Sequence, residues 1–377
     1  MIVLNVIEIK LLPVILIEFI VSYCRKMKHS QRENLLGQVI NSQYKIRKHL
    51  GSGSFGDVYE AEDILTQKIV ALKFENGNAP NPQLPNEYKY YNILQGGTNI
   101  PKVYGLYDYK KGRFLVMDKM GPSLEALFRL CNHTFSLKTV LMLADQMFRL
   151  IEYVHHCGII HRDIKPQNFV IGRNNLKRRI YLLDFGISTQ WIDTRTGEQV
   201  MFTTNNGLVG TAYYVSINVH LGDQQAPRDD LESIIYVLIR FLKGELPWQV
   251  FKYKNPEERN RKISQLKLKI DSEALCTGLP KEFTILLDYV RRLRYDEPPK
   301  YSWMRHVVAK LIEDSGYIND GIFDWDDEAS IHPPIPNDYL YKTAIAYLRR
   351  NERKLGNKKQ KVTLPTPRNF FIYGSKK

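Results

Sequence analysis

The order of apolar and polar residues predicts a strand-rich part near the start of the chain. Residues 44–50, 56–63 and 68–74 alternate apolar and polar side chains with the two-residue period of half-buried strands, and glycine-rich or polar turns separate them. Residues 104–109 and 113–118 show the same pattern. These runs predict a small antiparallel sheet.

Helical periodicity appears once between these strands and dominates the later part of the chain. Residues 86–94 have helical character and follow a polar, proline-containing loop. Residues 136–157 carry apolar side chains at three- and four-residue spacing, and Ser123 is placed to cap a helix over residues 123–130. Further helices are predicted at residues 228–242, 256–270, 281–293 and 303–315. The fold class that follows from this pattern is α+β.

Composition indicates the size of the fold, the compartment of the protein and the charge of its partners. The chain has 377 residues, of which 44% are hydrophobic, enough to bury a sizeable core in one large or two packed domains. Its four cysteines are far apart and form no C-x-x-C pair, which indicates a reducing compartment, cytoplasmic or nuclear, without a structural zinc site. The net charge of +14 favours acidic partners, although charge alone does not choose among acidic substrates, phosphates, anionic lipids and nucleic acid.

The first 24 residues are mostly apolar, but charged residues interrupt them. Their longest charge-free run, residues 11–17, is far shorter than the roughly 20 apolar residues that span a bilayer. A basic leader and a cleavage site are also missing, so we do not expect a signal peptide. Three alternatives remain: a hydrophobic helix lying on a membrane or on the domain, a weak anchor followed by basic residues, or an extension upstream of a start at Met27.

The last part of the chain departs from the globular pattern. Residues 333–336 are proline-rich and predict an extended linker, and residues 339–355 predict a short amphipathic helix. Residues 349–361 form a basic run. Nuclear targeting and contact with anionic lipid or nucleic acid are functional interpretations of that run, whereas a solvated, disordered tail is the simpler one.

The most specific chemical signal is a short polar stretch, residues 161–168, between two apolar runs. Phosphoryl transfer from ATP needs a carboxylate that accepts the proton of the attacking hydroxyl, a cation near the phosphoryl group and oxygen ligands for Mg²⁺. On this interpretation Asp163 is the base and Lys165 faces the γ-phosphate. Asn168 would hold the metal ions together with Asp184, the first residue of an Asp-Phe-Gly sequence. A polar turn with a cap would explain any one of these residues, but it poorly explains the whole set in this order.

A second signal lies between the first two predicted strands, where glycines allow backbone N–H groups to approach phosphate oxygens. This G-x-G-x-x-G pattern is weak alone, because a hairpin turn also produces it. However, a strand follows it instead of a helix, and Lys73 then stands at the position of a phosphate-pairing lysine. Glu87 is the predicted carboxylate partner of Lys73, with a plain surface glutamate as the alternative.

The last predicted strand ends at a Gly-Pro break, which fits a linker between the strand-rich and the helical parts. Adenine would bind there through backbone groups of residues 118–120. Met117 would lie at the back of the pocket, unless it is plain core. The complete predicted nucleotide-binding set is Leu50, Gly51, Ser52, Gly53, Ser54, Phe55, Gly56, Val58, Ala71, Lys73, Met117, Asp118 and Met120.

Two features of the helical part bear on the predicted site. A polar loop of about 30 residues follows Asp184, and so long a loop in a compact domain is usually functional, here as a platform for a protein substrate. Asp230 stands near the start of an apolar helix. It either caps that helix or braces the loop that carries Asp163.

Several further stretches complete a recognisable pattern. They are residues 120–125 (MGPSLE), 135–140 (FSLKTV), 143–147 (LADQM), 151–155 (IEYVH), Gly210-Thr211-Ala212, Ser216-Ile217-Asn218, residues 228–233 (RDDLES), 246–249 (LPWQ) and 323–325 (FDW). With these motifs the chain resembles the eukaryotic protein kinases and, within that superfamily, the casein kinase 1 family. The resemblance covers roughly residues 40–326.

The resemblance implies a bilobal protein kinase fold, with a small antiparallel β-sheet lobe that carries one helix and a larger, mostly helical lobe. It implies an N-terminal extension at residues 1–40, an N-lobe at 41–120, a C-lobe at 121–326 and a basic tail at 327–377. The activity implied is that of a serine/threonine kinase that uses ATP and Mg²⁺, acts as a monomer and does not require phosphorylation of its activation loop. Lys165, two residues after the base, matches the serine/threonine pattern.

Some positions depart from the family pattern and bear on substrate choice. Members of the family favour acidic or already phosphorylated sequences, which basic residues bind as anions. Tyr213 stands where the family usually has arginine, residues 188–190 replace a usual lysine pair, and Asn206 replaces a common loop lysine. Arg162 and Lys252 remain. We therefore expect weakened recognition of primed substrates and more reliance on plain acidic residues or on docking. Gln167 replaces a usual aspartate outside the chemical set.

Two other classes of protein are alternatives to an active kinase. A pseudokinase scaffold would bind partners through the same fold and the basic tail, but every member of the predicted catalytic set is present: Lys73, Glu87, Asp163, Lys165, Asn168 and Asp184. A nucleic-acid-binding protein would need a recognisable module, and none is visible. The expected partners are acidic protein substrates, with peripheral membrane contact through the N-terminal stretch as an open alternative.

Overall fold

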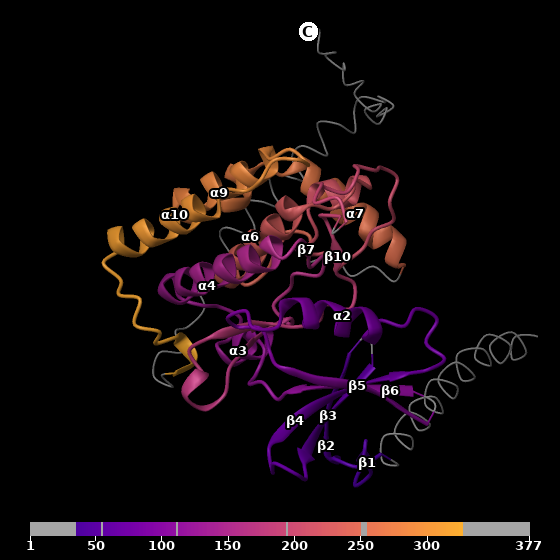
Figure 1. Cartoon of the computed structure of the whole chain (residues 1–377). Coiled ribbons are helices and arrows are strands. Elements are labelled where there is room, and N and C mark those ends of the chain that lie inside the picture. Colours follow the sequence, from indigo (N-terminus) through magenta and orange to yellow (C-terminus); the bar gives the residue numbers. More distant parts are fainter. Residues whose placement is uncertain (1–34, 54–55, 111, 194, 250–254, 327–377) are drawn as a thin grey trace, which may run out of the picture. The chain divides into compact units, whose positions relative to one another are not determined.

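Six strands form one antiparallel sheet in the order β1-β2-β3-β4-β6-β5 (Figure 1). Alternate side chains of these strands, among them Ile46, Tyr59, Leu72 and Phe114, are buried together in a core on one side of the sheet. The five strands predicted from alternation are confirmed, whereas β1 is too short to show a period. The strands are β1 (Val39–Ile40), β2 (Tyr44–Gly53), β3 (Gly56–Asp63), β4 (Ile69–Asn76), β5 (Val103–Tyr109) and β6 (Gly112–Asp118).

The computed structural model describes residues 35–53, 56–110, 112–193, 195–249 and 255–326. The N-terminal apolar stretch, the predicted tail helix and the basic run lie outside these ranges, as do Ser54, Phe55 and Lys252. All described residues belong to one compact unit. Across these ranges, no helix combines the length and the apolar character needed to cross a membrane.

The glycine-rich stretch differs from the prediction in one respect. Strand β2 was expected to end at Leu50, but its pairing with β3 continues through Gly51 and Ser52 to Gly53, which lies opposite Gly56. The glycines therefore stand at the paired ends of a hairpin. Gly56 has φ 139°, and a Cβ there would lie 1.9 Å from the carbonyl oxygen of Phe74, so the close approach of β4 requires glycine.

Helix α2 (Leu84–Leu94) packs on β5 and β6. It begins two residues earlier than predicted, because Pro85 fits the first turn of a helix, where its missing N–H costs no hydrogen bond. Leu84, Tyr91 and Leu94 are buried on its inner face together with the carboxylate of Glu87.

The helical part is built around α4 (Leu137–His156), which contacts α6 (Pro227–Lys243) and α10 (Tyr301–Asp314), while α6 also contacts α9 (Lys281–Arg292) (Figure 1). The predicted cap Ser123 accepts a hydrogen bond from Ala126 N at the start of α3, and Ser136 caps α4 in the same way. The other helices are α3 (Leu124–Leu130), α5 (Ile217–Leu221), α7 (Pro256–Lys269) and α8 (Ser272–Cys276), with 3₁₀ turns η1 (Asn174–Leu176) and η2 (Asp324–Asp326).

Two short strand pairs frame the polar loop at residues 161–168. Strand β7 (Ile159–Ile160) enters the loop and pairs with β10 (Thr189–Gln190). Strand β8 (Phe169–Ile171) leaves the loop and pairs with β9 (Ile180–Leu182), which leads to Asp184. Pairing across these short strands brings the two polar segments of the predicted site together.

Candidate active site

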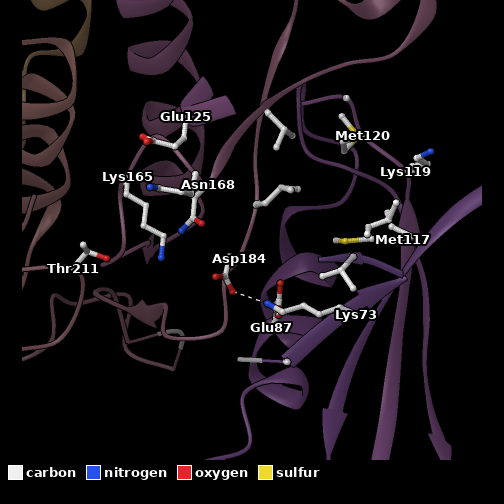
Figure 2. Close-up of a pocket in the computed structure, with 18 of the residues that line it drawn as sticks. Lys73, Glu87, Met117, Lys119, Met120, Glu125, Lys165, Asn168, Asp184 and Thr211 are labelled. Atoms are coloured by element: carbon white, nitrogen blue, oxygen red, sulfur yellow. Dashed lines mark hydrogen bonds and ion pairs between the residues drawn. The ribbon is translucent and has the colours of Figure 1, made fainter. Parts of the chain in front are cut away.

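A cavity of about 750 Å³ collects most of the residues predicted to bind a nucleotide. Its walls come from the sheet, from residues 117–125, from the loop at 165–170 and from residues 183–184 and 211–214 (Figure 2). The predicted residues that line it are Leu50, Gly56, Val58, Ala71, Lys73, Met117, Asp118 and Met120. Gly51, Ser52 and Gly53 lie in the neighbouring hairpin but are not among the lining residues that the structure describes.

Lys73 bridges two carboxylates inside this cavity. Its Nζ lies 2.7 Å from Glu87 Oε2 and 2.7 Å from Asp184 Oδ1 (Figure 2). Burial alone would lower the pKa of Lys73, but attraction to both carboxylates outweighs burial and raises it, so the ammonium stays charged. Burial raises the pKa of Glu87 to about 7. The pairing of Lys73 with Glu87 was predicted, whereas its contact with Asp184, 111 residues away, was not.

The Asp163 carboxylate is held by residues from two segments. Lys165 Nζ lies 2.5 Å from Asp163 Oδ2, and Thr211 donates its hydroxyl to Asp163 Oδ1 at 2.7 Å. Asn168 donates its amide nitrogen to the carbonyl oxygen of Asp163 at 2.9 Å. Asp163 is 3% exposed and is not among the cavity-lining residues, although Lys165, Asn168 and Thr211 all are.

In Figure 2 the side chain of Lys165 lies beside Asn168, and the ends of both side chains point towards the region of Asp184. Asp184 adopts φ 70°, a conformation rare for non-glycine residues and frequent at functional sites. Burial alone would raise the pKa of Asp184, but Lys73 and Lys165 outweigh burial and lower it, so the carboxylate is ionised. The amide nitrogen of Asn168 is engaged by Asp163, which leaves the amide oxygen as its metal-binding atom.

These two oxygen donors fit Mg²⁺, which binds carboxylate and amide oxygens and often uses only one or two protein carboxylates together with substrate phosphates. Within the described ranges, no group of three or more His, Cys, Asp or Glu side chains forms a metal site of another kind.

Asp230 braces the polar loop from beneath. Its carboxylate accepts hydrogen bonds from the backbone N–H groups of His161, at 2.7 Å, and Arg162, at 2.9 Å. It also lies 2.9 Å from His155 Nε2 of α4. The contacts of Asp230 therefore match the prediction that it braces the loop that carries Asp163. The start of α6 is capped instead by Asp229, which accepts a hydrogen bond from Ala226 N.

The segment after Asp184 is held from two sides by contacts that the sequence did not predict. Asn86 of α2 donates its amide to the carbonyl oxygens of Gly186, at 2.9 Å, and Ser188, at 3.2 Å. Arg162 donates Nε to the intervening carbonyl oxygen of Ile187 at 2.6 Å. Because Asn86 precedes Glu87, the same turn of α2 contacts both Lys73 and this segment.

Several lining residues at the end of the cavity near Lys165 were also missed. Glu125 of α3 forms a buried ion pair with Arg240 of α6, with Oε2 2.6 Å from Nη1. Tyr213 and Tyr214 line the cavity beside them. Their neighbour in sequence, Thr211, could have been suspected from the Gly-Thr-Ala motif, but the Glu125–Arg240 pair joins two distant helices and leaves no local signal.

His220, at the end of α5, provides a pH-dependent test of this region. Burial and the charge of Lys267 lower the pKa of His220 to about 3, from 6.5, and its Nε2 lies 3.2 Å from the carbonyl oxygen of Ala212. Between these pH values the unfolded chain binds more protons, so the contribution of His220 to stability is complete above pH 6.5 and is lost as the pH falls. We expect the free energy of unfolding to fall by about 1.4 kcal/mol per pH unit from this group alone.

Urea unfolding at pH 7 and pH 5 of the wild type and of His220→Gln measures this contribution. Glutamine keeps an N–H donor but does not titrate, so the wild type should lose about 2 kcal/mol more than the variant on acidification. Parallel losses in the two proteins would show that His220 does not titrate as described.

One comparison with known proteins bears on this geometry. The family model for the protein kinase domain matches residues 44–307, well over half of the chain. The match begins with the first residue of β2 and extends into α10, so it contains the whole cavity.

Proposed function

The chain belongs to the protein kinase family, and from this premise we propose that it is a serine/threonine kinase of the casein kinase 1 type that phosphorylates acidic proteins. The family implies transfer of a phosphoryl group from ATP with Mg²⁺. One observation carries the proposal: two clusters of polar and charged side chains lie close together. The first is Lys73 with Glu87 and Asp184, and the second is Asp163 with Lys165 and Asn168. A scaffold without activity would not need both clusters.

At the nucleotide end, Lys73 would bind the α- and β-phosphates, with Glu87 holding the ammonium in place. Adenine would pack against Ala71 and Met117, which lie opposite each other on β4 and β6, and contact the backbone of residues 118–120. The side chain of Asp118 is already engaged by Lys68, at 2.7 Å, which agrees with a role for backbone groups at this position. We propose that the sheet and the helical part act as two lobes around the nucleotide.

At the transfer end, Asp163 would orient the attacking hydroxyl and accept its proton. Lys165 would move from its contact with Asp163 towards the γ-phosphate and neutralise charge there. Asn168 and Asp184 would hold Mg²⁺, which neutralises the polyphosphate and keeps it in line. Thr211 would keep the carboxylate of Asp163 aimed while Lys165 moves.

The casein kinase 1 assignment is supported by the surroundings of Ser216-Ile217-Asn218. Ser216 caps α5 by accepting from Val219 N, and its hydroxyl donates to Asp229 Oδ1 at 2.5 Å. Asn218 donates to the same carboxylate oxygen at 3.4 Å. The Ser-Ile-Asn motif therefore connects the end of the long loop to α6 through hydrogen bonds. Most kinases have a glutamate carboxylate at this position of the motif.

The preference for acidic over primed substrates is supported by Tyr213. Its ring lines the cavity where the family usually has arginine, so the guanidinium that would bind a phosphate is absent at that position. A cation that lies over the Tyr213 ring is Arg259, with its guanidinium 5.9 Å from the ring centre. A single cation can pair with a carboxylate, whereas a phosphate group is bound more strongly where several charged donors contact its oxygens.

We expect a peptide with aspartate three residues before the target serine to be phosphorylated within about threefold of the rate of its phosphoserine counterpart, since a missing bidentate contact removes the advantage of the phosphate. Incorporation of labelled phosphate from ATP with Mg²⁺ measures both rates, and matched threonine and tyrosine peptides test the choice of hydroxyl. A strong preference for phosphoserine would overturn the substrate assignment alone. Transfer confined to tyrosine would overturn the serine/threonine assignment.

A further inference from the structure

Lys267 of α7 is completely buried, with 0% of its surface exposed, although most charged residues of that helix face solvent. Its Nζ donates to the carbonyl oxygens of Ala212, at 3.0 Å, and Val215, at 2.5 Å. The ammonium also lies over the rings of Tyr236 and Trp248, 4.9 and 5.0 Å from their centres. Across the described residues it forms no ion pair with a carboxylate.

Burial lowers the pKa of Lys267 well below its usual value, because a buried ammonium loses the hydration of water, and attraction to the Glu232 carboxylate offsets this only in part. Here two carbonyl dipoles and two aromatic faces replace part of that hydration. An apolar side chain of the same length would pack among the rings without this cost, but it would leave the carbonyl oxygens of Ala212 and Val215 without the ammonium. Lys267 therefore has a role beyond packing, because its hydrogen bonds fix two peptide groups of one short segment.

That segment, residues 211–215, forms the wall of the cavity at the transfer end. Thr211 at its start is bonded to Asp163, and Tyr213 and Tyr214 line the cavity. Between the two carbonyls held by Lys267, Trp248 donates Nε1 to the carbonyl oxygen of Tyr213 at 2.8 Å. Three carbonyl oxygens in four residues thus accept hydrogen bonds from two buried side chains, which fixes the backbone of this segment.

We propose that Lys267 is a positioning residue for the protein substrate: it shapes residues 211–215 into the surface against which the peptide around the target hydroxyl binds. The inference rests on the proposed kinase function. The contacts of Lys267 are with the carbonyl oxygens of Ala212 and Val215, so we expect its loss to change peptide binding more than ATP binding.

The test replaces Lys267 by methionine, which keeps the length and the packing but removes the amine that donates to the carbonyl oxygens of Ala212 and Val215. Lys269→Met is the matched control, because Lys269 lies on the same helix and is exposed. Initial rates are measured with peptide and ATP varied separately, and peptide binding is measured in parallel by titration calorimetry. We expect kcat/KM for the peptide to fall at least about tenfold in Lys267→Met and peptide Kd to rise by a similar factor, with KM for ATP within about twofold of the wild type.

Equal losses towards peptide and ATP would indicate a merely structural role and overturn the inference, as would an unchanged peptide Kd. If Lys267→Met does not fold, Lys267→Arg serves in its place: it keeps the charge but misplaces the donors, and the same selective loss towards peptide is expected. An inactive wild type would overturn the proposed function, whereas the comparison of peptide Kd values would still decide the role of Lys267. A wild type that binds no peptide would overturn the role of Lys267 as well.

Discussion

Asp163→Asn is expected to lower kcat by roughly 10³-fold, within the range that a general base contributes. Asparagine can still accept the hydroxyl of Thr211 and keep the shape of the loop, but it cannot take up the proton of the attacking hydroxyl. Because Asp163 does not line the nucleotide end of the cavity, KM for ATP should change by less than about threefold. Steady-state phosphate transfer to an acidic serine peptide measures both parameters.

The matched control for this variant is Asp108→Asn. The carboxylate of Asp108 is 90% exposed at the end of β5, so its loss should leave kcat within about twofold of the wild type. Retention of wild-type kcat in Asp163→Asn, or a loss confined to KM for ATP, would contradict the assignment of Asp163 as the base. Thermal unfolding of both variants separates a loss of chemistry from a loss of structure.

The parts of this fold that could be predicted from sequence are those with a local cause. Alternation located the five longer strands because their inner side chains share one core. The capping residue Ser123 located the start of α3, and apolar side chains at three- and four-residue spacing located α4. The start of α2 was placed two residues late because Pro85 was assigned to the preceding loop, although the first turn of a helix tolerates proline. Strands of two or three residues, such as β7 and β10, are too short to show any period.

In the candidate site, too, residues with a local sequence signal were predicted, whereas residues that act through long-range contacts were not. Residues within short motifs, such as Asp163, Lys165 and Asn168, were predicted together because their spacing carries the signal. The groups that hold them were not predicted, because each joins segments distant in sequence. Asn86 holds the carbonyl of Gly186, 100 residues away, and Lys267 holds that of Ala212, 55 residues away. In the sequence both look like surface residues of polar helices.

Asp230→Asn should be the most damaging change outside the cavity. The carboxylate accepts two backbone N–H groups and lies against His155, and it is 3% exposed. An asparagine offers one acceptor oxygen, so its amide nitrogen must face at least one of these N–H donors. We expect the free energy of unfolding to fall by about 3 kcal/mol, the scale of a broken buried polar network. We expect kcat to fall at least tenfold, because His161 and Arg162 directly precede the base.

The pH dependence of this loss identifies its cause. Burial alone would raise the pKa of Asp230, but hydrogen bonding and the charges of His155 and His161 outweigh burial and lower it. A carboxylate with a lowered folded-state pKa contributes stability that is complete above its unfolded pKa of 3.8 and is lost as the pH falls through the folded pKa. The stability gap between wild type and Asp230→Asn should therefore be constant from about pH 6 to 8 and narrow below about pH 4.

Urea unfolding across this pH range measures the gap, and Asp314→Asn is the control, since that carboxylate is exposed in a pair with Lys310. A constant gap down to pH 3 would mean that packing, and not the charge of Asp230, supports the loop. A variant with wild-type stability but a lowered kcat would mean that Asp230 orients the loop without stabilising the fold. Together the two measurements separate the role of this carboxylate in stability from its role in holding the base.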